Sequence, residues 1–455
     1  MRSQSFCSVS VCLLLLVCLS TSLIGCGQTR PTSSPVLSWI KQHALPLKTT
    51  DPRAPLDDLQ PLQRIVGSAS IVGLGEATHG SDEFFTMKHR LLEFLVERMG
   101  FTMFAMEGSW SAGEQINTYV LTGQGDAGDV LGQFHFWTWN TQEVLDLVYW
   151  VRAYDADPSH RQKVRFAGFD CQSIEPITLD HVTQYLQTVD PQSAARVTSL
   201  YQGLPQYLAS DAQLSPSTKQ QYLAHAQQVY ELFKQHETQY VARSSLQSFA
   251  QALQEARIVV QGVQFLSYNL NLNDPQSLAQ ANQQRDVFMA ENSAWLHEQA
   301  DGGSKLVLWA HDGHIQTVAQ AGYTPMGMHL RERYQSQYLP IGTSFYQGSF
   351  NAYGVDKSGQ FTPVQPFTVQ ASKQESYNYM FGHAGFSLFA LDLRHIPGGP
   401  VGQWMNGPHG FLTIGAVYNS AAGDTSYTSL SLPQCFDVII HIQKVTASQL
   451  IFQSQ

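Results

Sequence analysis

The sequence predicts an α/β protein in which a mostly parallel central sheet is flanked by helices and interrupted by a long α-helical insertion. Short apolar runs recur along the chain and end at glycine or polar residues, as interior strands of a parallel sheet do. Amphipathic stretches lie between these runs, and from residue 176 to residue 300 only helical patterns remain. We therefore expect a core formed by residues 36–175 and 301–455, with residues 176–300 inserted into it.

The first 25 residues have the composition of a targeting segment. Arg2 precedes an apolar stretch long enough for the hydrophobic region of a signal peptide. The segment ends in "LIGC", which resembles the lipobox of bacterial lipoproteins, with Cys26 as the thiol that would be acylated; an ordinary signal peptide with an incidental cysteine is the alternative. Residues 26–35 would then be a lipidated cysteine and a polar tether. We expect a protein of the cell envelope, held to a membrane outside the cytoplasm through lipid.

The candidate strands are apolar on both faces and are separated by turn-forming residues or by stretches with helical periodicity. Such spacing favours strands that are joined by crossover connections. In chain order the runs are "ASIVGLG", "FTMFAMEG", "VRFAGFD", "SKLVLWAHDG", "YLPIGTSFY", "SLFALDLR", "GFLTIGAVY" and "FDVIIHI".

Helical patterns fill the intervals. The stretch after the first run has apolar residues at helical spacing and ends at Gly100, a candidate C-cap. Residues 141–155 repeat the pattern, with Thr141 as candidate N-cap. In the insertion, apolar residues recur every three or four positions, at Tyr222, Ala226, Val229 and Phe233 and again at Leu246, Phe249, Leu253, Ala256, Val260 and Val263.

Composition argues against nucleic acid as a partner. The formal net charge is −10, and no cluster of lysine and arginine occurs that would hold phosphates. Of the six cysteines, Cys171 and Cys435 alone lie beyond residue 26, and their separation leaves open whether they pair or are small buried residues.

Ionisable residues follow several of the predicted strands. In an open α/β sheet the ligand site lies outside the carboxyl ends of the strands, so these positions are the candidate site. A single such residue would usually cap a helix, which is the alternative for Asp170, but several strand ends sharing the feature indicate chemistry. The residues are Glu76 and His79, Glu107, Asp170, and His311, Asp312 and His314.

Three common motifs are absent from these loops. "GLGEAT" supplies two glycines of a dinucleotide-binding loop, but Thr78 replaces the third, and Glu76 would repel a pyrophosphate. Neither GxSxG nor HExxH occurs in the sequence. The remaining histidines and carboxylates can activate water in two ways. A histidine oriented by a glutamate can take its proton directly, or the same residues can hold a divalent metal that acidifies bound water.

The combination "GLGEATHGSDEFFTMKHRLLEFLVERMGF", "FAMEGSW", "WTWNTQEVLDLVYWVRAYD", "VRFAGFDCQ", "RDVFMAEN" and "LWAHDGHI" resembles the erythromycin esterase family in order and spacing. The resemblance implies an α/β domain with a helical insertion and a hydrolase that adds water to an ester or lactone, the type of reaction by which members of the family open macrolide lactones. It also implies that His79 is the general base and Glu76 its partner, and that Glu107, His311 and His314 belong to the site. Lys88 stands where some members have an arginine, and it lacks the bidentate fork of that residue.

A mechanism that fits the residues and the resemblance starts from His79, which Glu76 orients and which removes a proton from water. The water attacks an ester or lactone carbonyl, and Lys88 with His311 and His314 stabilises the oxyanion. Further candidate substrate-binding residues are Phe134, Trp137, Trp139 and Asp170, although the aromatic ones can equally be packed beneath a loop. We expect no cofactor. The alternatives are a divalent-metal hydrolase with the same residues, and a surface lipoprotein that binds a hydrophobic ligand or haem without turnover.

Overall fold

The computed structural model describes residues 34–134, 136–204, 214–268, 275–299, 304–319, 323–357, 359–421 and 426–451. The predicted signal peptide and Cys26 lie outside these residues. Residues 35–455 form one compact unit. None of the described helices combines the length and apolar character that crossing a membrane requires.

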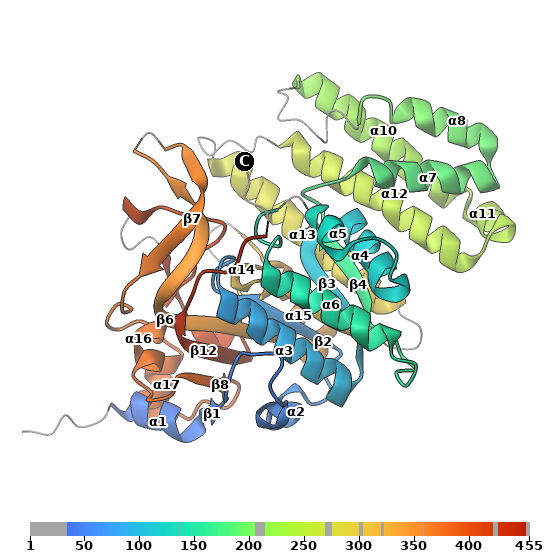
Figure 1. Ribbon diagram of the computed structural model, residues 1–455. Coiled ribbons are helices and arrows are strands. Elements are labelled where there is room, and N and C mark those ends of the chain that lie inside the picture. Colours follow the sequence, from blue (N-terminus) through green and yellow to red (C-terminus); the bar gives the residue numbers. More distant parts are fainter. Residues whose placement is uncertain are drawn as a thin grey trace, which may run out of the picture. The chain divides into compact units, whose positions relative to one another are not determined.

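The centre of the unit is a mixed, mostly parallel sheet (Figure 1). Its strands lie in the order β1-β8-β12-β6-β2-β5-β3-β4, and all neighbours from β12 to β4 are parallel. Strands β7 and β10 extend the distal part of β6. The bounds are β1 Leu45–Pro46, β2 Ile71–Glu76, β3 Phe101–Ser109, β4 Arg165–Asp170, β5 Lys305–His311, β6 Tyr338–Val355, β7 Phe361–Val369, β8 Leu388–Asp392, β10 Val417–Tyr418 and β12 Val438–Val445.

Alternation along the strands divides the core between the two faces of the sheet. In β5, Val307 and Trp309 belong to one hydrophobic cluster, whereas Leu306 and Leu308 belong to the other. The first cluster includes α3 (Asp82–Met99), α4 (Trp110–Thr122), α5 (Ala127–Gly132) and α6 (Gln142–Ala156), together with η1 (Asp57–Leu59) and α2 (Leu62–Val66). The second includes α1 (Pro35–His43), α13 (Pro275–Gln299), α14 (Asp312–Ile315), α15 (Met326–Tyr334), α16 (Tyr377–Gly382), α17 (Gly399–Met405) and α18 (Leu432–Cys435); η2 (Gln335–Gln337) follows α15.

Most of the described residues between β4 and β5 form helices, which Figure 1 shows in green and yellow. Five of these helices pack around a separate hydrophobic cluster: α7 (Pro176–Val189), α8 (Pro191–Leu200), α10 (Pro216–Gln235), α11 (Glu237–Arg243) and α12 (Leu246–Ser267). The last helix, α13, contacts α12 but also packs against β3, β4 and β5. The segment predicted as an insertion therefore reaches the sheet of the core.

The predicted fold class is confirmed, and so are the predicted helix caps. Gly100 has φ 72°, the left-handed conformation that ends α3, and Thr141 Oγ1 accepts a hydrogen bond from the Val144 amide at the start of α6. Leu246 is not part of a buried stripe: it is 68% exposed because it is the first residue of α12.

Two predicted strands differ from interior parallel strands. β8 runs antiparallel to β12. "GFLTIGAVY" is wrong as an interior strand, because its first half, β9 (His409–Leu412), pairs with β11 (Tyr427–Leu430) in a separate sheet, and its second half is β10. Between them the Ile414 amide donates a hydrogen bond to the carbonyl of Ala77, so the segment crosses the end of β2, and only β10 joins the sheet, beside the distal part of β6.

Candidate active site

The site lies where four neighbouring parallel strands end at the same edge of the sheet. Glu76 is the last residue of β2, His311 of β5 and Asp170 of β4, and Glu107 lies near the end of β3. Glu76 and His311 are direct partners in the register of β2 and β5. The position of each residue at a strand end, predicted from the sequence, is therefore what brings them together.

Close packing explains the glycines of the first loop. A Cβ atom at Gly75 would overlap the carboxylate of Asp312, which is buried beneath β2 and accepts hydrogen bonds from the Thr343 amide. A Cβ atom at Gly80 would overlap the backbone of Asn351. Burial raises the pKa of Asp312 to about 8. The two glycines therefore leave room for neighbouring protein atoms, as expected where chain segments approach closely. They do not form a space for a phosphate, as the glycines of a dinucleotide-binding loop do.

Glu76 connects His79 to Lys88. One carboxylate oxygen of Glu76 lies 3.0 Å from Nδ1 of His79, and the other forms an ion pair with Nζ of Lys88. Lys88 lies on α3, is 1% exposed, contacts the carbonyl of Ala310 and lies over the ring of Trp309 at 4.5 Å. Burial lowers the pKa of Lys88 well below its usual value, whereas the carboxylates of Asp312 and Glu107 favour the charged amine. Lys88 therefore binds the oxygen of Glu76 that His79 does not use.

The ring of His79 is oriented as that of a general base would be. Because Glu76 accepts from Nδ1, the lone pair is on Nε2, for which the described residues provide no hydrogen-bond partner. Burial, only partly opposed by the carboxylate of Glu107, lowers the pKa of His79 to about 4. The ring is therefore neutral near pH 7 and able to accept a proton.

Two rings enclose His79. Its centroid lies 4.9 Å from that of His311, and Trp139 packs edge-on against it at 5.6 Å. Nδ1 of His311 accepts from the Gly313 amide, which leaves Nε2 to donate to the carbonyl of Ile414 at 3.2 Å. Burial lowers the pKa of His311 well below its usual value. Both nitrogens of His311 are thus used within the protein.

Glu107 is the centre of a second network. Its carboxylate accepts from Arg285 at 2.6 Å and from the His311 amide at 2.9 Å. Arg285 also donates to both oxygens of Asp170, at 2.9 and 2.7 Å, the bidentate geometry that arginine favours. Burial opposes the charge on Glu107, but the cations of His314 and Arg285 hold its pKa well below the usual value.

His314 extends this network to α13. Its Nδ1 lies 2.9 Å from Asp286 and its Nε2 lies 3.2 Å from Glu107. Burial opposes the charged ring, yet these two carboxylates raise the pKa of His314 to about 10. Tyr323 also reaches Nδ1, at 3.0 Å. His314 is therefore an imidazolium near neutral pH, in contrast to His79 and His311.

Arg285 and Asp286 were not identified as site residues from the sequence. They lie on α13, within the segment predicted as an insertion; Arg285 is separated by 178 positions from Glu107, and Asp286 by 28 from His314. A signal was present, since both fall on the buried stripe of the helix that includes Ala281 and Met289. Charged residues on such a stripe need partners in the interior.

The predicted substrate-binding residues have different surroundings. Asp170 both caps the turn at the Cys171 and Gln172 amides and binds Arg285, so it is at once a cap and a member of the site network. Trp139 contacts His79 and donates to the carbonyl of Glu107. Phe134 is fully buried against Gly108, and Trp137 packs edge-on against Tyr353.

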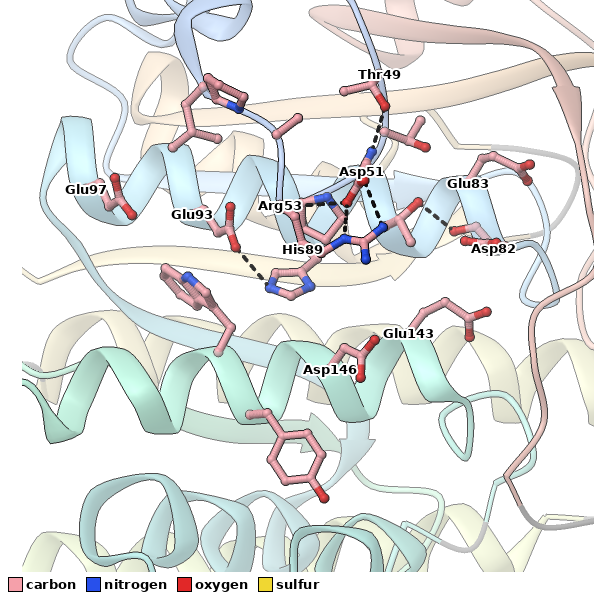
Figure 2. A pocket seen from close by; sticks show the side chains of 18 of the residues that line it. Thr49, Asp51, Arg53, Asp82, Glu83, His89, Glu93, Glu97, Glu143 and Asp146 are labelled. Atoms are coloured by element: carbon pink, nitrogen blue, oxygen red, sulfur yellow. Dashed lines mark hydrogen bonds and ion pairs between the residues drawn. The ribbon is translucent and has the colours of Figure 1, made fainter.

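A cavity in the described part of the chain lies away from these networks (Figure 2). It has a volume of about 1050 Å³ and lies between the 49–57 segment, α3 and α6. Figure 2 shows Glu93 of α3, Asp146 of α6 and Arg53 among its lining residues. None of the residues of the histidine and carboxylate networks lines it, so the candidate site rests on its chemistry and not on cavity size.

Metal ligation at the site is geometrically possible. One ligand atom each of Glu76, His79 and Glu107 lie within 4.8 Å of one another, and all three residues are buried. A cation placed there would compete with Lys88 for Glu76 and with Arg285 for Glu107. The geometry thus admits a metal, while the existing ion pairs already compensate both carboxylates.

Comparison with known proteins gives the family. The family model described as erythromycin esterase matches residues 96–445. This range includes Glu107, Asp170, Arg285 and His311, and it begins after Glu76, His79 and Lys88. The chain is 24% identical to erythromycin esterase type II of Escherichia coli, over 91% of this chain and 99% of that protein.

Solved structures agree in fold. A Bacillus cereus protein is 34% identical, with a TM-score of 0.82 over 92% of this chain and 98% of that one. A variant of the erythromycin esterase EreC in an open conformation is 16% identical, with a TM-score of 0.71 over 89% of this chain and 98% of that one, which demonstrates the shared fold. On the family match, which covers most of the described residues, the chain belongs to the erythromycin esterase family.

Proposed function

We propose that this hydrolase cleaves carboxylic esters, including lactones, by metal-free general-base catalysis. The observation that carries the proposal is the buried Glu76–His79 pair, in which His79 is neutral and its Nε2 is free of hydrogen bonds to described residues. Membership of the family, and a relative that is named as an erythromycin esterase, support an ester as the substrate class.

In the proposed reaction, Nε2 of His79 takes a proton from water while the water oxygen attacks the carbonyl carbon. Glu76 accepts from Nδ1 and stabilises the imidazolium that forms, as a carboxylate does behind other catalytic histidines. The tetrahedral intermediate then collapses, and the leaving alkoxide takes the proton from Nε2. Acid and alcohol are released, or a hydroxy acid if the substrate is a lactone.

The oxyanion needs a cation on the side of His79 that faces the second network. His314 and Arg285 are both charged and close enough to depress the pKa of His79. Lys88 binds the oxygen of Glu76 that His79 does not use, and His311 has a lowered pKa and therefore no charge to offer an oxyanion. We therefore assign oxyanion stabilisation to His314 and Arg285, with Lys88 as a positioning residue for Glu76.

The test is hydrolysis of aryl esters, alkyl esters, simple lactones and a macrolide by a soluble form that begins after Cys26. We expect turnover in the unmodified chain, a loss of about 100-fold or more in kcat for His79→Ala, and no change for the exposed control His383→Ala. Circular dichroism checks that the variants fold. Full activity of a folded His79→Ala variant would exclude His79 as the base.

The second candidate is a metal-dependent hydrolase, which the Glu76, His79 and Glu107 cluster favours. The same assay after dialysis against a chelator separates the two. Activity that is lost to chelator and restored by a divalent ion would transfer these residues to a metal site. Activity unaffected by chelator supports the general-base mechanism, and absence of turnover on every substrate would favour a ligand-binding protein.

We also propose that Cys26 anchors the chain to a membrane of the cell envelope through lipid. The support is the sequence "LIGC" at the end of an apolar segment. Expression of the full chain in a bacterium with a labelled fatty acid should label the protein, and Cys26→Ser should abolish the label. Labelling that persists in Cys26→Ser would contradict the proposal.

A further inference from the structure

A second group of potential metal ligands lies outside the active site. Glu114 on α4, His181 on α7 and Glu255 on α12 each direct one ligand atom into a common space in which these atoms lie within 4.8 Å of one another. Figure 1 shows α4 in the region of α7 and α12. The three residues come from the core and from two helices of the inserted bundle, and none of them touches the networks of Glu76 or Glu107.

The distances within this group are those of ligands around an ion. Nδ1 of His181 lies 3.4 Å from Oε1 of Glu255 and 3.7 Å from Oε2 of Glu114. A hydrogen bond between nitrogen and oxygen usually spans about 2.7–3.2 Å. Ligand atoms that bind a tetrahedral zinc ion at about 2.0–2.2 Å lie about 3.3–3.6 Å apart. The spacing therefore fits a bound ion better than a set of direct hydrogen bonds.

A buried oxygen in the group lacks a hydrogen bond. Oε2 of Glu114 is inaccessible to solvent and has no hydrogen-bond partner among the described residues, although water or a charge normally satisfies a buried carboxylate. His181 is the ionisable cation beside two carboxylates; the side chain of Glu255 is 6% exposed, whereas those of Glu114 and His181 are 25% and 35% exposed. One buried and one partly buried carboxylate side by side are costly unless positive charge compensates them, and a bound ion would add to the charge that a protonated His181 supplies.

The neighbouring side chains hold the carboxylates as the outer shell of a metal site does. The side-chain amide of Gln251 donates to Oε1 of Glu114 and, at 3.3 Å, to Oε1 of Glu255. Gln251 lies one turn before Glu255 on α12, so the helix itself fixes this arrangement. Such hydrogen bonds orient ligating carboxylates.

A cavity adjoins the group. It has a volume of about 370 Å³, and Glu114, His181 and Gln251 line it together with Trp110, Asn117 and Arg165. An ion held by three protein ligands would therefore have room for water at a fourth position.

We propose that Glu114, His181 and Glu255 form a binding site for one divalent transition-metal ion, of which zinc is the representative. The donor set of one imidazole and two carboxylates suits zinc or manganese. The ion joins α4 of the core to α7 and α12 of the bundle, so its removal loosens the attachment of the bundle without altering the residues of the active site.

The test uses Co²⁺ as a spectroscopic substitute for zinc, in the soluble chain carrying His79→Ala so that the active-site cluster lacks its imidazole. We expect one Co²⁺ per chain with a visible absorption band, displacement of that band by Zn²⁺, and a higher melting temperature with Zn²⁺. Glu114→Gln keeps the acceptor for Gln251 but replaces Oε2, and it should abolish the band, as should His181→Ala. Gln251→Ala should weaken binding by roughly 10–100-fold.

The matched control is His225→Ala. His225 lies in the same bundle and forms a hydrogen bond with the carbonyl of Leu200. It should bind Co²⁺ as the parent does. Equal binding by the parent, Glu114→Gln and His181→Ala would overturn the proposal, and so would absence of any binding in the folded parent. Because His79→Ala removes the proposed base, neither result depends on whether the chain hydrolyses esters.

Discussion

Lys88 and Glu76 form an ion pair that is buried on every side, and Glu76 uses its other oxygen to bind His79. This ion pair joins the N-terminal part of α3 to the end of β2. A lysine in the interior carries a large desolvation cost, which is tolerated only where a partner compensates the charge. Lys88 therefore serves as the polar partner that fixes Glu76 in the orientation that His79 requires.

Replacing Lys88 by methionine should destabilise the fold and impair catalysis together. Glu76 would remain buried without a cation, at a cost of about 3–5 kcal/mol in the free energy of unfolding. A urea titration measures this cost. Lys234→Met is the control, because Lys234 pairs with Glu231 at the surface and its removal should change stability little. Equal midpoints for the two variants would show that the buried pair contributes no more than the exposed one.

The pH dependence of activity should reflect the depressed pKa of His79. The ring is neutral above its folded pKa of about 4, so kcat/KM should be flat from pH 8 to about 5.5 and should fall with a slope of one below about pH 4–5. An acid limb centred near pH 6.5, the value of an unperturbed histidine, would contradict this assignment. Initial rates on a neutral ester that is stable across the range provide the measurement.

The same shift predicts a loss of stability in acid. The folded pKa of His79 lies below its unfolded value of about 6.5, so the unfolded chain binds the proton first as the pH falls. As far as His79 is concerned, the free energy of unfolding is highest above about pH 6.5. It declines between that pH and about pH 4, with a limiting slope of about 1.4 kcal/mol per pH unit. Relative to the parent, His79→Gln should show a shallower decline in this window.

Much of the site could be predicted from the sequence because the relevant signals are local. Glu76, Glu107, Asp170 and His311 each follow an apolar run, and parallel strands end at one edge of a sheet. Once the runs are identified as neighbouring strands, their last residues must meet. The same local logic identified Thr141 and Gly100 as helix caps.

The remainder depends on contacts that local periodicity does not encode. Arg285 meets Asp170 across 115 positions, and nothing in the pattern of α13 states which strand it packs against. The segment that contains β9 and β10 has the apolar character of an interior strand, yet its backbone hydrogen bonds go to Ala77, β6 and β11. Only the assembled fold specifies these partners.

Arg285→Lys should reduce activity strongly although it conserves the charge. The guanidinium bonds Asp170 with two nitrogens and Glu107 with one of them, and an ammonium cannot reproduce this fork. Glu107 also accepts a hydrogen bond from the His311 amide, so a displaced Glu107 would shift His311 next to His79. We expect kcat/KM to fall by ~100-fold. Arg257→Lys, at a partly exposed pair with Glu291, should retain parental activity, and similar losses in both variants would refute the specific role.

Cys171 and Cys435 should behave as free, inaccessible thiols. Both are buried without a disulfide, and burial raises the pKa of Cys171 well above its usual value and that of Cys435 to about 12. A thiol reagent can reach them only after an opening of the structure that costs about 5 kcal/mol or more, so labelling of the native soluble chain should be slower than that of the unfolded chain by roughly 4000-fold or more. Unfolding without reductant should release two reactive thiols per chain. No reactive thiol after unfolding would mean that the two cysteines are paired, and rapid labelling of the native chain would mean that at least one is open to solvent.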